Sequence, residues 1–253
     1  MNDWALITGA SAGIGCELAR LFAADRHNLI LVARDQARLD ALAAELRAQH
    51  GIQTRVLAQD LAAPAAAQKI FDALRDTPVS VLVNNAGFGV FGLFAEEDLR
   101  AQTEIIQVNV TALMELTHLF VRPMLARRRG RILNVASTAA FQPGPTVSVY
   151  YASKAFVYSF SYALADELAG SGVTVTTLCP GGTRTEFFAR AGHRPMHGAA
   201  LMDARIVAQI GYRGLLRGQR VVIPGALNRI ASLIAKRLPA RLTSPVVRRI
   251  HRK

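Results

Sequence analysis

Two tyrosines and a lysine stand close together in the stretch VSVYYASKAF at residues 147–156, which has no other charge. Residues four apart share a helix face, so the spacing favours Tyr150 over Tyr151 as the partner of Lys154, although only slightly. A unit charge ~4 Å from a phenol, at an effective dielectric constant of ~20, is worth about 4 kcal/mol or roughly three pK units. We therefore expect Lys154 to lower the pKa of Tyr150 toward neutrality, where a phenol exchanges protons with a carbonyl or alcohol oxygen.

A serine, Ser137, closes the apolar run GRILNVAS thirteen residues before Tyr150. Ligands of parallel α/β sheets bind beyond the carboxyl ends of the strands. We therefore expect the Ser137 hydroxyl to lie at this edge of the sheet, where it would hold a substrate oxygen beside the phenol. An ordinary cap at the end of a strand is the alternative role for this serine.

A glycine-rich turn follows the first strand-like run, in LITGASAGIGCELARLF at residues 6–22. Its glycines, Gly9, Gly13 and Gly15, form the pattern TGxxxGxG. Glycine tolerates positive φ and lets the backbone approach a pyrophosphate, whose charge is stabilised by the free amides of a helix N-terminus. The pattern predicts a dinucleotide cofactor, and a tight turn without a ligand is the alternative.

The second strand-like run, NLILVA at residues 28–33, is followed by Arg34 rather than by an acid. An acid here would bind the 2′-hydroxyl of an NAD ribose, whereas the planar guanidinium of arginine suits a 2′-phosphate. We therefore predict NADP(H) in preference to NAD(H). Two observations weigh against this preference: Asp35 could reach a ribose diol, and the glycine-rich turn has Ser11 and Ala12 in place of a basic residue.

Seven apolar runs rich in β-branched residues alternate with longer stretches of helical period. The runs are ALIT (5–8), NLILVA (28–33), TRVLAQ (54–59), VSVLVNN (79–85), GRILNVAS (130–137), GVTVTTLCP (172–180) and QRVVIPG (219–225). Such alternation is typical of a parallel sheet covered on both sides. We predict a single-domain α/β fold of the Rossmann type, a doubly wound parallel sheet with helices on both faces. Residues 1–225 are expected to form the dinucleotide-binding catalytic domain and residues 226–253 a basic C-terminal extension.

The composition narrows the class of protein. A chain of 253 residues with 51% apolar residues is long enough to bury a full enzyme core. Cys16 and Cys179 are far apart and outside any CxxC or Cys/His cluster, so we expect neither a disulfide framework nor a metal site, and a reducing, cytoplasmic location. The start, MNDWALITGA, lacks the features of a signal peptide. Residues 146–165 carry no charge except Lys154, but a lysine in mid-span is costly in lipid, so we expect a helix buried in protein.

The last fifty residues account for the charge excess. Residues 1–203 contain 18 Lys/Arg and 18 Asp/Glu, whereas residues 204–253 contain 12 Lys/Arg and no acid. Three interpretations are open: a solvated surface, peripheral attachment to an anionic membrane surface, and nucleic-acid binding. Nucleic acid is the weakest of the three, because the tail matches no known nucleic-acid-binding module and offers no aromatic residues for base stacking.

The tail also has a partly amphipathic pattern, which supports the membrane interpretation. Apolar residues recur at near-helical spacing at Leu227, Ile230, Leu233 and Ile234. Cations share the same segment at Arg229, Lys236 and Arg237. Pro239 should end this helix.

Taken together, these motifs resemble those of the short-chain dehydrogenase/reductase family. TGASAGIG, NNAG, VNV, Ser137 and YxxxK occur in the order of the family, and the resemblance spans most of residues 5–190. It implies that Tyr150 is the catalytic acid/base, that Lys154 lowers its pKa and holds the nicotinamide ribose, and that Ser137 orients the substrate. It also implies that Asn109 of the VNV motif supports a proton relay.

The resemblance assigns further cofactor-binding positions, to which Arg34, Tyr150 and Lys154 also belong. The glycine-rich turn would contribute Thr8, Gly9, Ser11, Gly13, Ile14 and Gly15. At the end of the third strand, Asp60 would contact the adenine and Leu61 would line its surroundings. The end of the fourth strand would shape the adenosine side and brace the sheet through Asn84, Ala86 and Gly87. The turn CPGGTRTEF would contribute Pro180, Gly181, Thr183 and Thr185, with one of the threonines at the nicotinamide amide or the pyrophosphate.

The predicted mouth of the site is rich in aromatic residues. They are Phe88, Phe91, Phe141, Phe187 and Phe188, and the QPGP loop at 142–145 lies near them. We expect an apolar, partly lidded site for a small-molecule substrate here, with ordinary core packing as the alternative role of these side chains. Residues 186–195, EFFARAGHRP, are expected to form a flap over bound ligand.

The leading hypothesis is an NADP(H)-dependent carbonyl reductase or alcohol dehydrogenase in which Tyr150 is the acid/base. The alternative is a non-catalytic sensor that binds NADP(H) and signals through its tail. An intact set of Asn109, Ser137, Tyr150 and Lys154 favours the enzyme. A homo-oligomer is among the assemblies that we consider.

Overall fold

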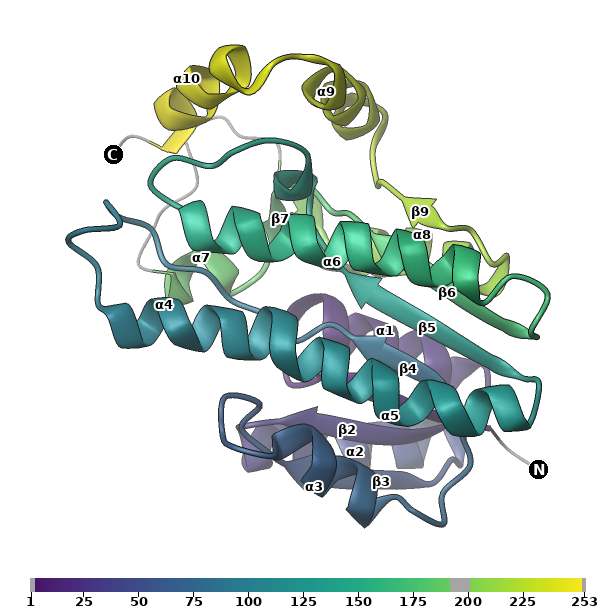
Figure 1. The fold of residues 1–253 in the computed structure, drawn as a ribbon. Coiled ribbons are helices and arrows are strands. Elements are labelled where there is room, and N and C mark those ends of the chain that lie inside the picture. Colours follow the sequence, from purple (N-terminus) through teal and green to yellow (C-terminus); the bar gives the residue numbers. More distant parts are fainter. Residues whose placement is uncertain (1–2, 192–200, 252–253) are drawn as a thin grey trace.

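A seven-stranded parallel sheet forms the centre of the molecule, whose computed structural model describes residues 3–191 and 201–251 (Figure 1). Within these residues the strand order is β3-β2-β1-β4-β5-β6-β9. The strands are β1 (Trp4–Thr8), β2 (Asn28–Ala33), β3 (Thr54–Ala58), β4 (Val79–Asn84), β5 (Gly130–Val135), β6 (Val173–Leu178) and β9 (Val221–Val222). Each strand lies within a predicted run, except that β1 begins one residue before its run. The predicted doubly wound sheet is confirmed.

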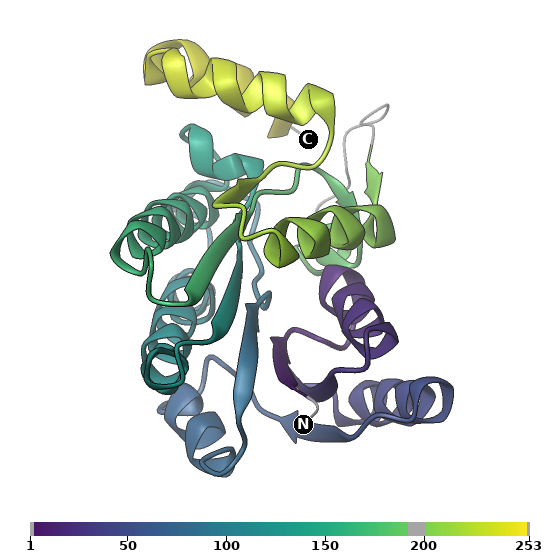
Figure 2. The ribbon, with the colours of Figure 1, turned by 90° about the vertical axis from the view of Figure 1, so that its right-hand side faces the viewer.

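Helices cover both faces of this sheet, which Figure 2 shows nearly edge-on between its two helical layers. One layer contains α1 (Gly13–Ala24), α2 (Gln36–His50) and α8 (Ala204–Leu216). The other contains α3 (Ala66–Ala73), α4 (Leu99–Ile106), α5 (Leu113–Ala126) and α6 (Ser148–Glu167). Successive strand side chains point to opposite faces, so Ile7 packs in the core with Phe22 while Leu6 packs in the core with Phe120. Both faces of the central strands are therefore buried.

The order of the strands reverses between β1 and β4. β1 pairs with β2 on one side and with β4 on the other. The connection that follows β1 and the connection that follows β4 run to opposite faces of the sheet. Such a switch point leaves a crevice at the carboxyl edge, where ligands of open α/β sheets bind. The motifs at the ends of β1, β4 and β5 are thereby brought together.

Short elements surround this edge. They are η1, a π-helical turn (Gln107–Ala112), η2, a 3-10 turn (Thr138–Phe141), α7 (Phe187–Arg190), and the paired strands β7 (Thr183–Arg184) and β8 (Met202–Asp203). The predicted flap at 186–195 begins with α7, and its residues 192–195 lie outside the described part of the chain. In the described ranges, no helix has the length and apolar character needed to cross a membrane.

The segment after β9 forms two helices, α9 (Ala226–Arg237) and α10 (Ala240–His251), at the end of the molecule nearest β9 (Figure 1). The predicted end of the first helix before Pro239 is confirmed. A second helix, α10, for which we made no prediction, follows and buries Thr243 and Val247. The division into a domain at 1–225 and an extension at 226–253 stays a prediction.

Candidate active site

A cavity of about 1090 Å³ opens at the carboxyl edge of the sheet, at the switch point between β1 and β4. Its wall includes most of the residues singled out in the sequence: Gly9, Ser11, Gly13, Ile14, Arg34, Asp60, Leu61, Ala86, Gly87, Ser137, Tyr150, Lys154, Pro180, Gly181, Thr183 and Thr185. Four predicted residues lie behind this wall: Thr8, Gly15, Asn84 and Asn109. The cavity is larger than most small-molecule sites, which measure ~300–1,000 Å³, and has room for an extended ligand.

The glycine-rich turn presents the N-terminus of α1 to the cavity. Ala12 precedes the helix and makes no side-chain cap, so the first amides of α1 beside Gly13 and Ile14 are open to an anion. Gly13 has φ +57°, a conformation that favours glycine. A β-carbon on Gly15 would collide with the carbonyl oxygen of Gly9. Gly15 therefore shapes the turn from behind rather than lining the site.

Hydrogen bonds fix this turn to the end of β4. The Thr8 hydroxyl accepts from the backbone amides of Asn85 at 3.0 Å and Ala86 at 3.1 Å. The Asn85 amide donates in return to the carbonyl oxygens of Thr8 at 2.9 Å and Gly9 at 3.2 Å. Thr8 thus positions the cavity wall and does not contact the cavity.

The two asparagines of the NNAG motif have different positions. Asn84 is buried and donates to the Thr117 hydroxyl at 3.0 Å and to the Asn134 side chain at 2.9 Å, so it braces β4 against α5 and β5. Asn85 lines the cavity instead. Asn84 therefore braces the sheet, as the resemblance implies, whereas its side chain does not line the cavity, and its role at the adenosine side stays a prediction. The doubled asparagine was the signal that could have identified Asn85.

At the tip of β2, Arg34 and Asp35 differ in how they are engaged. Asp35 caps α2 by accepting from the Arg38 amide at 3.0 Å, and its other carboxylate oxygen pairs with the Arg38 guanidinium at 3.3 Å. Arg34 is exposed at the cavity and forms no ion pair or side-chain hydrogen bond with another described residue. The carboxylate that could bind a ribose diol is thus occupied, whereas the guanidinium is available.

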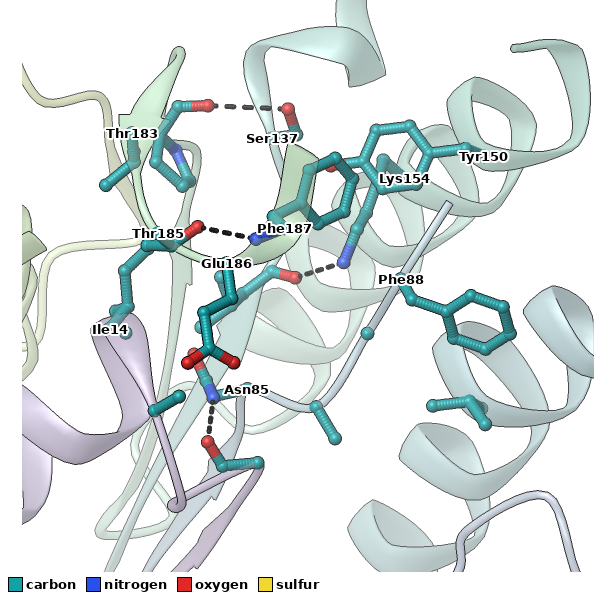
Figure 3. Close-up of a pocket in the computed structure, with 18 of the residues that line it drawn as sticks. Ile14, Asn85, Phe88, Ser137, Tyr150, Lys154, Thr183, Thr185, Glu186 and Phe187 are labelled. Carbon is teal, nitrogen blue, oxygen red and sulfur yellow. Dashed lines mark hydrogen bonds between the residues drawn. The ribbon is translucent and has the colours of Figure 1, made fainter. Parts of the chain in front are cut away.

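Tyr150, Lys154 and Ser137 meet at one side of the cavity (Figure 3). Tyr150 and Lys154 come from the first turns of α6, and Ser137 follows β5. The Lys154 ammonium donates to the Val135 carbonyl oxygen at 2.9 Å and lies 5.7 Å from the centroid of the Tyr150 ring. The Ser137 hydroxyl donates to the Pro180 carbonyl oxygen at 3.4 Å, caps η2 by accepting from the Ala139 amide at 3.1 Å, and lies beside Tyr150 at the cavity wall.

The pKa of Tyr150 does not move in the direction that we expected. Burial raises the pKa of Tyr150 to about 12, and the neighbouring Ser137 hydroxyl opposes this rise. Burial also lowers the pKa of Lys154 to about 8. The prediction that Lys154 brings the phenol toward neutrality is therefore wrong for the protein groups alone: the ammonium is bonded to Val135, and desolvation of the phenol dominates. At neutral pH, Tyr150 holds its proton.

Asn109 lies in the π-helical turn Gln107–Ala112, a type of turn that is frequent at functional sites. It is fully buried, and its amide donates to the Phe88 carbonyl oxygen and to the Ser153 hydroxyl, both at 3.0 Å. The Asn109 oxygen accepts from the Phe88 amide at 3.1 Å, and Ser153 donates to the Tyr150 carbonyl oxygen at 2.7 Å. The side chain thus ties the loop after β4 to the helix that carries Tyr150.

Comparisons with known proteins agree with this arrangement. Residues 3–195 match the model of the short chain dehydrogenase family. The chain belongs to the short-chain dehydrogenase/reductase family. Over 183 residues it is 42% identical to a very-long-chain 3-oxoacyl-CoA reductase of Phaeosphaeria nodorum, a match that covers 69% of this chain and 53% of the relative. The chain thus spans about half the length of the curated relatives that it matches first.

Solved structures of short-chain dehydrogenases share the whole fold. A short-chain dehydrogenase from Sphingobium yanoikuyae in complex with NADPH has a TM-score of 0.86 and 36% identity, with 93% of each chain covered. A short-chain dehydrogenase/reductase from Burkholderia phymatum in complex with NAD has a TM-score of 0.83 and 25% identity, with 96% of this chain and 95% of that chain covered. A nicotinamide dinucleotide is therefore the cofactor class, while neighbours of both kinds leave the choice between the two dinucleotides to the residues at the tip of β2.

Aromatic side chains form part of the remaining cavity wall in this short-chain dehydrogenase/reductase. Of the predicted aromatic residues, four line the cavity: Phe88, Phe91, Phe187 and Phe188. The exception is Phe141, which is buried against Tyr158 and the Lys236 side chain. The QPGP loop does not line the cavity either, since its Gly144 packs on the Tyr151 ring. The predicted position at the cavity is thus confirmed for the phenylalanines that follow β4 and β7. It is wrong for Phe141 in η2 and for the QPGP loop.

The C-terminal helix α10 contributes to the same wall, which sequence reasoning missed. Ile250 and His251 line the cavity, and the His251 ring nitrogen Nε2 lies 2.8 Å from the Tyr151 hydroxyl. The two tyrosines of the opening motif are therefore separated in role: Tyr150 faces Lys154 and Ser137, whereas Tyr151 joins α6 to α10. No local pattern could have indicated a contact between residues a hundred positions apart in the chain.

Proposed function

We propose that this protein is an NADP(H)-dependent reductase of bulky apolar ketones, with Tyr150 as the proton donor. The observation that carries the proposal is the convergence of a protonated phenol, a buried lysine and a serine hydroxyl on one side of the cavity. A phenol beside a cation and a hydroxyl group suits the reduction of a carbonyl, because a proton must reach the oxygen as hydride reaches the carbon.

The residues of the cavity fit a phosphorylated dinucleotide. The open amides at the start of α1 would hold the pyrophosphate, and Thr185 lies next to Gly13 above this turn. Arg34 would bind a 2′-phosphate, because its guanidinium is unengaged and the neighbouring Asp35 is tied to Arg38. Of the two structural neighbours, the one that is 36% identical to this chain is bound to NADPH and the one that is 25% identical is bound to NAD. Asp60, whose carboxylate already accepts from the Ala62 amide at 2.9 Å, would border the adenine.

The protein groups would then complete the chemistry as follows. When bound, the reduced dinucleotide supplies a hydride to the carbonyl carbon. The Ser137 hydroxyl orients the carbonyl oxygen, and the Tyr150 hydroxyl gives its proton to that oxygen as the C=O π bond breaks. The phenolate that remains is stabilised by the Lys154 ammonium, which lies over the same ring. Because the pKa of Tyr150 is raised to about 12, the phenol is in the form that ketone reduction needs at neutral pH.

The apolar wall supports a bulky substrate. Phe91 and Phe188 lie 6.4 Å apart between ring centroids, and Phe187 lies 5.2 Å from the Tyr150 ring. Ile250 adds an aliphatic surface from α10. The named activity of the fungal relative, a very-long-chain 3-oxoacyl-CoA reductase, also points to a carbonyl next to a long apolar group.

A panel of ketones tests this proposal. The purified chain is assayed with aliphatic, alicyclic and aromatic ketones of increasing size, and oxidation of NADPH or NADH is followed by nicotinamide absorbance. We expect kcat/KM to rise with the apolar size of the ketone and to be at least about tenfold higher with NADPH than with NADH. Absence of turnover with every ketone, although NADPH binds, would point instead to the non-catalytic sensor.

A further inference from the structure

The helices α9 and α10 expose apolar side chains at helical spacing along their outer sides. On α9 they are Leu227, Ile230, Leu233 and Ile234, and on α10 they are Leu242, Val246 and Ile250. Leu227 is 81% exposed, and the inner sides of the helices are marked by the buried residues Ser232 and Val247. Single exposed apolar residues are ordinary, but a repeated stripe on two consecutive helices indicates an interaction surface. We call these seven residues the outer stripe.

Cations flank the outer stripe without acidic partners. They are Arg229, Arg237, Arg241, Arg248 and Arg249, and none of them forms an ion pair with another described residue. The sequence contains no Asp or Glu after Asp203. The local surface is therefore strongly positive as well as apolar.

Lys236 does not belong to this set, contrary to our grouping of it with Arg229 and Arg237. Its ammonium donates to the Tyr158 hydroxyl at 2.7 Å and lies 4.5 Å from the ring centroids of both Phe141 and Tyr158. These contacts hold α9 against η2 and α6. The outer stripe is thus presented by a helix that is anchored to the body of the protein.

We propose that α9 and α10 form a docking surface for an anionic lipid bilayer. Apolar side chains would enter the boundary between headgroups and acyl chains while the arginines pair with lipid phosphates and carboxylates. A second copy of the chain fits less well, because a two-fold interface places the same patch on both sides and would bring arginine against arginine. A nucleic acid would leave the outer stripe without a partner, and residues 226–251 contain no Phe, Tyr or Trp to stack on bases.

The docking surface adjoins the cavity. Ile250 belongs to the outer stripe, being 44% exposed, and it also lines the cavity beside His251. An apolar ketone dissolved in the bilayer would therefore reach Tyr150 past the end of α10. This last step rests on the proposed function, whereas the docking does not.

Vesicle sedimentation of the full chain tests the docking. The probes are vesicles of phosphatidylcholine alone and of phosphatidylcholine with ~30% phosphatidylserine. We expect binding to the anionic vesicles and at least tenfold weaker binding to the neutral ones. The double variant Leu227→Ser/Leu233→Ser should lose at least about tenfold in affinity for anionic vesicles, because it removes two leucine side chains that would insert into the bilayer. The control Leu99→Ser, which alters a leucine 71% exposed on α4, should bind as the unaltered chain does.

A second pair of variants separates charge from apolar insertion. Arg248→Gln and Arg249→Gln should each weaken binding to the anionic vesicles by up to about fivefold, and the control Arg217→Gln at the end of α8 should not. Equal binding to neutral and anionic vesicles, or serine variants that bind as well as the unaltered chain, would overturn the proposal. The proposal would also be overturned if the serine variants left vesicle binding unchanged and instead altered the mass of the protein in light scattering or its retention on DNA.

Leu227 and Leu233 do not line the cavity and their side chains are exposed, so the two substitutions should leave the chemistry intact. Their circular dichroism, and their rate with a water-soluble ketone, should match those of the unaltered chain. If no ketone is reduced by any of these proteins, the sedimentation result still decides the docking. The two proposals therefore fail by different observations.

Discussion

The turn after β1 and the C-terminal helix α10 line the same cavity, yet they are held there by different kinds of interaction. The turn is fixed by glycine contacts and by hydrogen bonds between Thr8 and Asn85, at strand ends that are adjacent in the sheet. α10 is held by the burial of Val247 and by the bond between His251 and Tyr151. The comparison indicates that the cofactor side of the site is a rigid part of the sheet edge. The substrate side depends on a distant segment, in which substitutions should lower the free energy of unfolding only slightly.

Gly15→Ala should give the largest effect on cofactor binding, because it disturbs the turn that lies against the sheet edge. The added methyl would collide with backbone at Gly9 and with the Asn85 side chain, so the turn must move. We expect the free energy of unfolding to fall by about 1–3 kcal/mol and NADPH affinity to fall roughly a hundredfold. Fluorescence titration with NADPH and denaturant unfolding measure both. The same substitution at Gly170, which has nothing within 4 Å, should leave NADPH binding unchanged; a Gly15→Ala protein with ordinary NADPH affinity would show that the turn is not rigid.

Lys154→Met sharpens the comparison through the dependence of stability on pH. The unfolded chain keeps its lysine proton up to pH ~10.4, whereas the folded chain releases it at about 8. Between these values the unfolded state binds more protons, so the lysine makes the free energy of unfolding rise with pH. The difference in this free energy between the unaltered chain and the variant should change by roughly 3 kcal/mol from pH 8 to 10.5. Parallel curves for the two proteins would mean that the pKa of Lys154 is not lowered.

Arg34→Ala tests whether the residue at the tip of β2 determines the preference for NADPH over NADH. Loss of a charge-assisted bond to a 2′-phosphate should weaken NADPH binding roughly thirtyfold. NADH affinity serves as the internal control and should change by less than about twofold. Equal losses for both dinucleotides would remove Arg34 from the choice of cofactor.

His251→Ala should give the smallest effect, since it removes one hydrogen bond to Tyr151 and one ring contact with Phe91 on the substrate side. We expect a loss of about 1 kcal/mol in the free energy of unfolding and a higher KM for bulky ketones, with NADPH affinity unchanged. Tyr151→Phe removes the same bond from α6, so the double variant should show a coupling energy of about 1 kcal/mol. Additive effects of the two substitutions would show that α10 is not held through this bond.

The same contrast explains how much the sequence could predict. Strand positions and the motifs at their ends are local patterns: the seven runs, the glycine-rich turn and the approach of Tyr150 to Ser137 follow from alternation and from the shared edge of parallel strands. The choice between Asn84 and Asn85 requires the direction of a strand end, which a run apolar on both faces does not reveal. Motif patterns therefore predicted which segments meet at the cavity and left the direction of single side chains open.

Other features depend on the folded chain as a whole. The pKa of Tyr150 follows from its desolvation and from the bond that Lys154 makes to Val135, and neither can be read from their spacing. Lys236 turns inward because Phe141 and Tyr158 offer aromatic faces below α9. The return of α10 to the cavity is a contact over the full length of the chain, for which a single sequence contains no signal.

The central claim is that the Tyr150 hydroxyl gives its proton to the substrate, and Tyr150→Phe measures this most directly. The substitution keeps the ring and removes the hydroxyl. With NADPH bound and a bulky ketone added, single-turnover oxidation of NADPH should slow by a factor of about 10²–10⁴, while the Kd for NADPH changes by less than about twofold. A Tyr150→Phe protein that reduces the ketone at nearly the original rate would contradict the account.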